Sequence, residues 1–220
     1  MRYSFGFHSP TPVVTRCLIA IIGAYLGFAL FGKSHVGRTI YQALMLDPYQ
    51  TVYSFQLWRL VTYAFLHDMS SPMHVILNAL MLYMLGTPLE ERFGERRFFI
   101  FIMAAIISGG VLVCLSFLIG LTSAPVVGFS AATLGLIVAW GLTFSTQSIY
   151  ILGILPLSGT QLVYITIGLE ILYAVSADSI SSAAHFGGII TAFVFVKELY
   201  RPRRLKQMWN QRKIRRNLRR

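Results

Sequence analysis

Four polar side chains lie within or beside apolar stretches of the sequence and could together carry out chemistry. Ser130 follows a short loop, and His185 lies near the start of the last apolar stretch. A histidine can take the proton of a serine hydroxyl as that hydroxyl attacks an amide carbonyl, so this pair predicts acyl transfer with Ser130 as nucleophile and His185 as general base. His74 and Asn78 are four residues apart and share one face of a helix, where they could donate hydrogen bonds to the oxyanion.

The composition of the chain indicates that lipid surrounds it. Of its 220 residues, 55% are hydrophobic and only 12% are charged, which is too apolar for an ordinary soluble domain. Apolar runs of near-spanning length fall at residues 13–32, 73–88, 97–120, 130–147, 161–176 and 182–199. These runs predict an all-α, polytopic membrane protein, with one domain over residues 13–200 that forms a six-transmembrane-helix bundle.

The predicted spans place the four polar residues at a similar depth. His74 lies at the external start of the second span, Ser130 opens the fourth, and His185 is about one turn into the sixth. Several spans of 16–18 residues would be only about 24–27 Å long, less than the roughly 30 Å hydrocarbon core, so some helix ends should stop inside the membrane. Because ionisable side chains are costly in a membrane, the sequence predicts one functional site in the resulting water-filled recess.

Basic residues are distributed unequally over this predicted topology. The chain has 19 Lys and Arg against 8 Asp and Glu, and all of the basic residues except Lys33, Arg38 and Arg59 fall on the side of the two termini. The positive-inside rule therefore predicts a cytoplasmic N-terminus over residues 1–12 and a basic cytoplasmic tail over residues 201–220. Residues 33–72 form the predicted external loop, lying partly in the membrane interface. The tail is expected to lie against anionic lipid and not to bind nucleic acid.

Small residues are expected to shape the site. Gly128, two residues before Ser130, would let the backbone turn sharply into the fourth span. Gly188 and Ala192, four residues apart, would let the sixth span pack closely against the fourth and bring His185 to Ser130. Cysteine and histidine spacings fit no zinc site, so neither a metal nor an organic cofactor is expected.

Short motifs follow one another in a fixed order along most of the chain. Between about Gln56 and Lys197 these are Trp58-Arg59, His74-x-x-x-Asn78, Leu85-Gly86 and Leu89-Glu90 with Gly94, then Gly128-x-Ser130 and Ala184-His185-x-x-Gly188. Each motif alone is weak, but their order on these spans resembles the rhomboid family of intramembrane serine proteases.

The resemblance implies a role for most of the motif residues. It implies a Ser130–His185 dyad without a third acidic member, an oxyanion pocket from His74 and Asn78, and cleavage of transmembrane or membrane-anchored proteins. A bacterial inner membrane fits such a chain, and the fifth span would act as a lateral gate for the substrate.

The remaining motif residues are expected to support the structure. Trp58 and Arg59 would brace the external loop, the first as an interfacial aromatic and the second by binding loop carbonyls. Glu90 would bond to nearby backbone at the end of the second span, and Gly94 would form the turn that follows.

Two positions depart from the family pattern in the fourth span. Ala131 stands where the residue after the nucleophile is usually glycine, and Leu134 stands where an aromatic often stacks on the catalytic imidazole. A third departure is Ala192, at the second glycine of the sixth-span packing motif. These departures favour, as an alternative, a catalytically weak or inactive rhomboid-like protein that binds transmembrane clients.

Other ionisable residues have simpler interpretations. Glu170 is the one carboxylate in the fifth span and could orient His185, but a structural hydrogen bond to another helix is the favoured interpretation. His67 and Asp68 lie in the external loop, where a solvated pair is expected.

Overall fold

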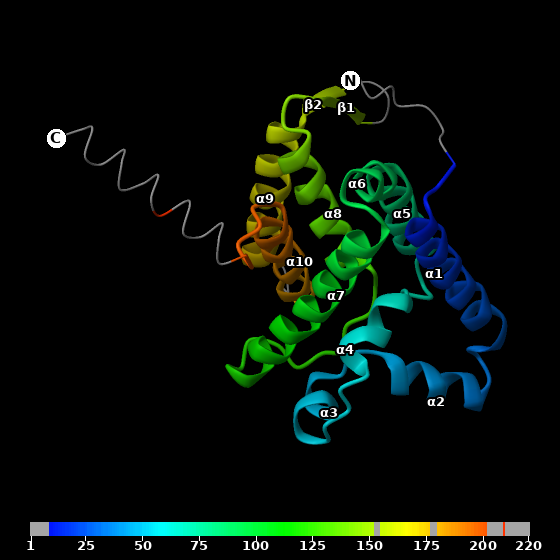
Figure 1. The fold of residues 1–220 in the computed structure, drawn as a ribbon. Coiled ribbons are helices and arrows are strands. Elements are labelled where there is room, and N and C mark those ends of the chain that lie inside the picture. The colour runs from blue at the N-terminus through cyan, green and yellow to red at the C-terminus, as the bar shows by residue number, and fades with distance from the viewer. Residues whose placement is uncertain (1–8, 152–154, 177–179, 202–208, 210–220) are drawn as a thin grey trace.

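The helices and strands follow in the order shown in Figure 1, a computed structural model that describes residues 9–151, 155–176, 180–201 and 209. The first half contains α1 (Pro12–Phe31), α2 (His35–Leu44), α3 (Pro48–Tyr53), α4 (Arg59–Thr62), the 3-10 turn η1 (Tyr63–Phe65), α5 (Pro72–Met81), the π-helical η2 (Leu82–Gly86) and α6 (Thr87–Phe93). The second half contains α7 (Glu95–Leu118), α8 (Ser130–Thr143), β1 (Ser148–Ile151), β2 (Leu155–Ser158), α9 (Gly159–Ser176) and α10 (Ile180–Val196).

Within the described residues, three helical segments are long and apolar enough to cross a membrane. They are α1, the continuous segment Pro72–Phe93 and α7, with 20, 22 and 24 residues. The segments α8, α9 and α10 are shorter apolar helices. All six predicted apolar runs are thus mainly helical, but six complete crossings of a membrane remain a prediction.

The fourth predicted span is shorter than expected because its last residues leave the helix. Helix α8 has 14 residues and ends at Thr143, which gives a length of about 21 Å. The chain then forms an antiparallel hairpin in which Ser148 pairs with Ser158 and Ile149 with Leu157. The protein is mostly helical as predicted, but these residues form a short two-stranded hairpin that the sequence did not predict.

The predicted external loop, residues 33–72, is largely helical. It contains α2, α3, α4 and η1, and Figure 1 shows α2 extending sideways from the end of α1. Ser34 caps the start of α2, because its side chain accepts a hydrogen bond from Gly37 N. Asp47 caps α3 in the same way by accepting from Gln50 N. The loop is therefore an ordered layer, and its placement in the membrane interface stays a prediction.

Helix α10 packs closely against both α7 and α8. A Cβ atom on Gly187 would lie 2.6 Å from Gly109 Cα of α7, and one on Gly188 would overlap the Ala131 carbonyl oxygen of α8. The sequence predicted the second contact but not the first. Small residues on three helices thus allow the backbones to approach. Figure 1 shows α1 and α9 on opposite outer sides of this group.

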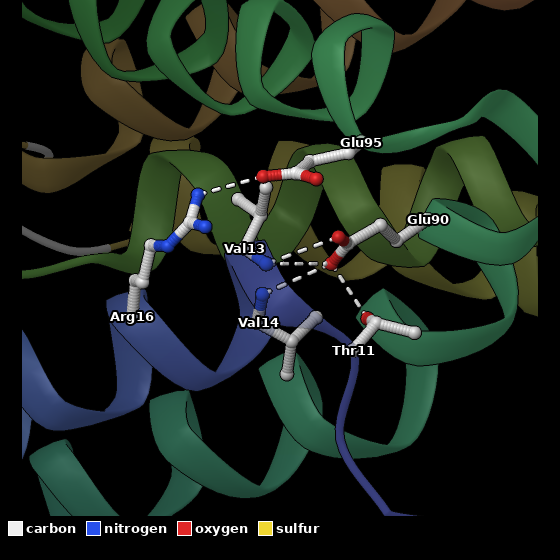
Figure 2. A network of polar contacts seen from close by, with 6 residues as sticks. All are labelled: Thr11, Val13, Val14, Arg16, Glu90 and Glu95. Atoms are coloured by element: carbon white, nitrogen blue, oxygen red, sulfur yellow. Dashed lines mark hydrogen bonds and ion pairs between the residues drawn. The ribbon is translucent and has the colours of Figure 1, made fainter.

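Glu90 joins α6 to the first turn of α1 (Figure 2). Its carboxylate accepts hydrogen bonds from Val13 N at 3.0 Å, Val14 N at 3.0 Å and Thr11 Oγ1 at 2.6 Å. These backbone donors belong to the first turn of a helix, where no carbonyl of the same helix can accept from them. The predicted backbone contacts of Glu90 therefore reach across to another helix, where its charge complements the positive end of the α1 dipole.

Candidate active site

A sharp turn places Ser130 at the first position of α8. Gly128 has φ of +123°, a backbone conformation that strongly favours glycine, and its N–H donates to the Tyr63 carbonyl at 3.0 Å. A Cβ atom at position 128 would lie 2.8 Å from His74 Nε2 and 3.8 Å from Ser130 Oγ. Glycine therefore provides both the turn and the space in which the His74 ring lies beside the Ser130 hydroxyl.

The loop residues Trp58 and Arg59 hold the segment that leads into this turn. Arg59 is 6% exposed, and its guanidinium donates to the carbonyls of Gln42 and Met45 at 2.7 and 2.5 Å. Trp58 Nε1 donates to Ala43 O at 3.0 Å. The chain directly after α2 then pairs with the segment before Gly128, through two hydrogen bonds between Leu46 and Val126. The two side chains thus support the turn through the end of α2, and neither lies in the candidate site itself.

His185 on α10 lies within hydrogen-bond reach of Ser130. The distance from His185 Nε2 to Ser130 Oγ is 2.9 Å, which satisfies the geometric requirement for a general base and its nucleophile. The close packing at Gly188 and Ala131 holds the two helices at the separation that this contact needs. Ser130 and His185, which are 55 positions apart in the sequence, are thus brought together.

Glu170 on α9 approaches the other side of the imidazole. Its Oε2 atom lies 3.0 Å from His185 Nδ1, and the two side chains are 8% and 15% exposed. The favoured interpretation of Glu170, a structural hydrogen bond to another helix, did not name this partner. The contact instead fits the less favoured alternative, in which Glu170 orients His185. The one signal in the sequence was a lone carboxylate within an apolar run.

Helix α5 contributes His74 and Asn78 to the site. Asn78 is buried, its Nδ2 donates to the His74 carbonyl at 2.8 Å, and its Oδ1 accepts from Thr133 Oγ1 on α8 at 2.8 Å. Thr133 was not predicted to contribute. Because Thr133 donates to the oxygen of the Asn78 amide, the nitrogen is the end that donates. This nitrogen carries a second N–H besides the one that donates to the His74 carbonyl.

His67 is not part of a solvated pair with Asp68. Its ring is 1% exposed and packs edge-on against His74, with 5.1 Å between ring centroids. Burial, with a smaller contribution from His74, lowers the pKa of His67 from 6.5 to about 4. Asp68 is exposed and accepts hydrogen bonds from Ser70, which lower its pKa. His67 is therefore a neutral, buried neighbour of the site at neutral pH, and the expectation of a solvated histidine is wrong.

Glu90 and Gly94 lie at a different level of the molecule. Glu90 follows His74 by 16 residues along the helical segment Pro72–Phe93, which corresponds to roughly 24 Å. Gly94, with φ of +81°, forms the turn between α6 and α7. The motif residues thus divide into those around Ser130 and those that connect helices elsewhere.

Comparison with known proteins identifies the family of this fold and site. A family model described as the Rhomboid domain matches residues 54–202. The chain belongs to the rhomboid family. The resemblance inferred from the motifs is thereby confirmed, and the family together with the apolar helices makes this an integral membrane protein.

Individual rhomboid proteins show moderate similarity over part of the chain. Over 101 residues it is 32% identical to the rhomboid protease GlpG of Salmonella choleraesuis (strain SC-B67), and 31% identical to those of Salmonella paratyphi A (strain ATCC 9150 / SARB42) and Salmonella typhi. Each match covers 46% of this chain and 34% of the relative. The matched part thus spans about a third of the length of these rhomboid proteases.

Proposed function

We propose that this rhomboid protein is an intramembrane serine endopeptidase that cleaves transmembrane or membrane-anchored proteins. The observation that carries the proposal is the 2.9 Å contact between Ser130 Oγ and His185 Nε2, in a chain whose family is established by the match over residues 54–202. The relatives named as rhomboid proteases support the same activity.

The proposed reaction begins when His185 Nε2 accepts the Ser130 proton and Ser130 Oγ attacks the carbonyl carbon of the scissile amide. The negative charge that develops on the carbonyl oxygen is stabilised by donors from His74, Asn78 and the Ser130 backbone N–H, at the positive end of the α8 dipole. The imidazolium then gives its proton to the leaving amine, and an acyl group remains on Ser130. Water, activated by His185, hydrolyses this ester and restores the site.

The membrane setting is part of the proposal. Six crossings with both termini in the cytoplasm would place the site near the external face of a bacterial inner membrane, and a substrate span would enter beside α9. The outward face of α9 supports this entry because several large apolar side chains on it are exposed, among them Tyr164, Leu169, Leu172 and Val175. The basic tail, proposed to lie against anionic lipid, falls outside the described residues except for Arg201 and Trp209.

The test is cleavage of a single-span model substrate by the purified protein in liposomes. Wild type, Ser130→Ala and His185→Ala are compared with two matched controls, Ser123→Ala and His35→Ala, which change an exposed serine and an exposed histidine. We expect the first two substitutions to abolish cleavage and the controls to retain it.

The contrary outcomes are distinct from each other. Cleavage that survives Ser130→Ala would assign the activity to another residue or to a contaminant. A folded wild type that cleaves none of several substrates, and yet retains them in co-purification, would favour the client-binding alternative, for which Ala131 and Leu134 already provide a reason.

A further inference from the structure

We propose that Glu170 is a positioning residue for His185, so that Ser130, His185 and Glu170 act as a three-membered unit. This inference rests on the proposed protease function and deepens it. It replaces the two-membered dyad that the sequence motifs imply with an arrangement contributed by three different helices, α8, α10 and α9.

The tautomer of His185 is the first argument. A neutral imidazole carries one N–H, so a ring that accepts the Ser130 proton at Nε2 must carry its own proton at Nδ1. A carboxylate is an acceptor only, and Glu170 Oε2 lies 3.0 Å from Nδ1 while Ser130 Oγ lies 2.9 Å from Nε2. Each neighbour thus matches the role that the reaction requires of the ring atom it contacts.

The orientation of the ring is the second argument. Leu134 lies one helical turn after Ser130 and borders a groove between α8 and α9 together with Glu170. An aliphatic side chain can fill space beside the imidazole, but it has no polar atom that would fix rotation of the ring. A hydrogen bond to Nδ1 does fix it, and in this chain Glu170 provides that bond.

The cost of the carboxylate is the third argument. Glu170 is 7% exposed on an otherwise apolar helix, and an ionised side chain there is expensive unless it has a partner. Among the ion pairs formed by the described residues, the partner of Glu170 is His185. When His185 takes the Ser130 proton, the two mostly buried side chains form opposite charges in contact, which stabilises the transition state.

The test compares Glu170→Gln and Glu170→Leu with Thr166→Val, a control one helical turn earlier on α9 that borders the same groove. We measure kcat and KM for cleavage of the model substrate from pH 5 to 9. Gln preserves the shape and an acceptor but not the charge, whereas Leu removes both. We expect kcat to fall in the order Glu, Gln, Leu, by about 100-fold or more for Leu, with KM and the control almost unchanged.

The glutamine variant separates positioning from a structural role. Glu170→Gln keeps the size of the side chain and an oxygen that can accept from His185 Nδ1, so a merely structural role predicts that Gln retains the kcat of Glu. Positioning through a negative carboxylate predicts a kcat for Gln well below that of Glu, with KM unchanged. Equal kcat in active Glu170→Leu and wild type would overturn the inference and leave the protease intact.

A measurement on wild type that does not depend on protease activity tests the inference if the variants misfold or if wild type does not cleave. Nitrogen NMR of histidine-labelled wild type, with the His185 signals identified by their loss in His185→Gln, reports which ring nitrogen carries the proton. We expect Nδ1–H in wild type at pH 8. An Nε2–H tautomer would overturn the role of Glu170, whereas Nδ1–H in a protein without protease activity would support the contact and refute only the proposed function.

Discussion

Glu90→Ala should weaken the attachment of α1 to the rest of the protein. The substitution removes the acceptor for Val13 N, Val14 N and Thr11 Oγ1. Both valines are buried, and Glu90 itself is 3% exposed, so water cannot readily replace the lost contacts. Each buried N–H left without a partner costs about 1–3 kcal/mol. We therefore expect Glu90→Ala to lower the free energy of unfolding by roughly 2–5 kcal/mol.

A matched control comes from the same contact network. Figure 2 shows Glu95 pairing with Arg16, at a distance of 2.7 Å. The two side chains are 52% and 69% exposed. An exposed pair contributes about 0–1 kcal/mol, so Glu95→Ala should change stability little. Thermal unfolding in detergent, followed by circular dichroism, should show a midpoint lowered on the order of 10 °C for Glu90→Ala and nearly unchanged for Glu95→Ala. Equal shifts in the two variants would refute the reasoning from burial.

Three further predictions follow from the site. Gly128→Ala should reduce cleavage at least 10-fold and lower the free energy of unfolding by about 1–2 kcal/mol. An alanine is strained at φ of +123°, and its Cβ displaces the His74 ring. The cleavage assay and thermal unfolding measure the two effects. Gly188→Val should abolish cleavage because the valine side chain overlaps the Ala131 carbonyl and separates α10 from α8. Distances between spin labels on the two helices would measure the separation. Lowering the pH from 6.5 to about 4 should reduce the free energy of unfolding by roughly 3 kcal/mol through His67, whose pKa is lowered on folding to about 4. The unfolded state binds the proton at higher pH than the folded state, so the loss is complete below pH 4. The pH profile of unfolding for His67→Gln should lack this loss.

The helices could be predicted from sequence because their cause is local. An apolar run in a membrane protein must satisfy its backbone hydrogen bonds internally, and a helix does so within the run. The first, third and fifth predicted spans therefore lie within about two residues of α1, α7 and α9. Helix α8 was predicted too long because the run up to residue 147 is still apolar enough to continue a span, whereas the helix ends at Thr143. The hairpin that follows, Ser148–Ile151 with Leu155–Ser158, depends on residues farther along the chain.

Only those features of the candidate site that lie within one helix or turn could be predicted from the sequence. The spacing of His74 and Asn78 and the glycine before Ser130 are local features. In the fold His74 lies beside Gly128, and Asn78 contacts Thr133 in the first turn of α8. The contact of Glu170 with His185 depends on how α9 packs beside α10, which no local pattern encodes. The burial of His67 likewise depends on the fold of residues 33–72, which was not predicted to be helical.

The most direct test of the account is covalent labelling of the nucleophile. The purified protein in liposomes is treated with a serine-reactive fluorophosphonate, and the modified peptide is identified by mass spectrometry. We predict a single adduct on Ser130 in wild type and in Ser123→Ala, and no adduct in His185→Ala, because without the base the hydroxyl is not activated. An adduct on another serine, or equal labelling of Ser130 in His185→Ala, would contradict the claim that Ser130 and His185 form the catalytic pair.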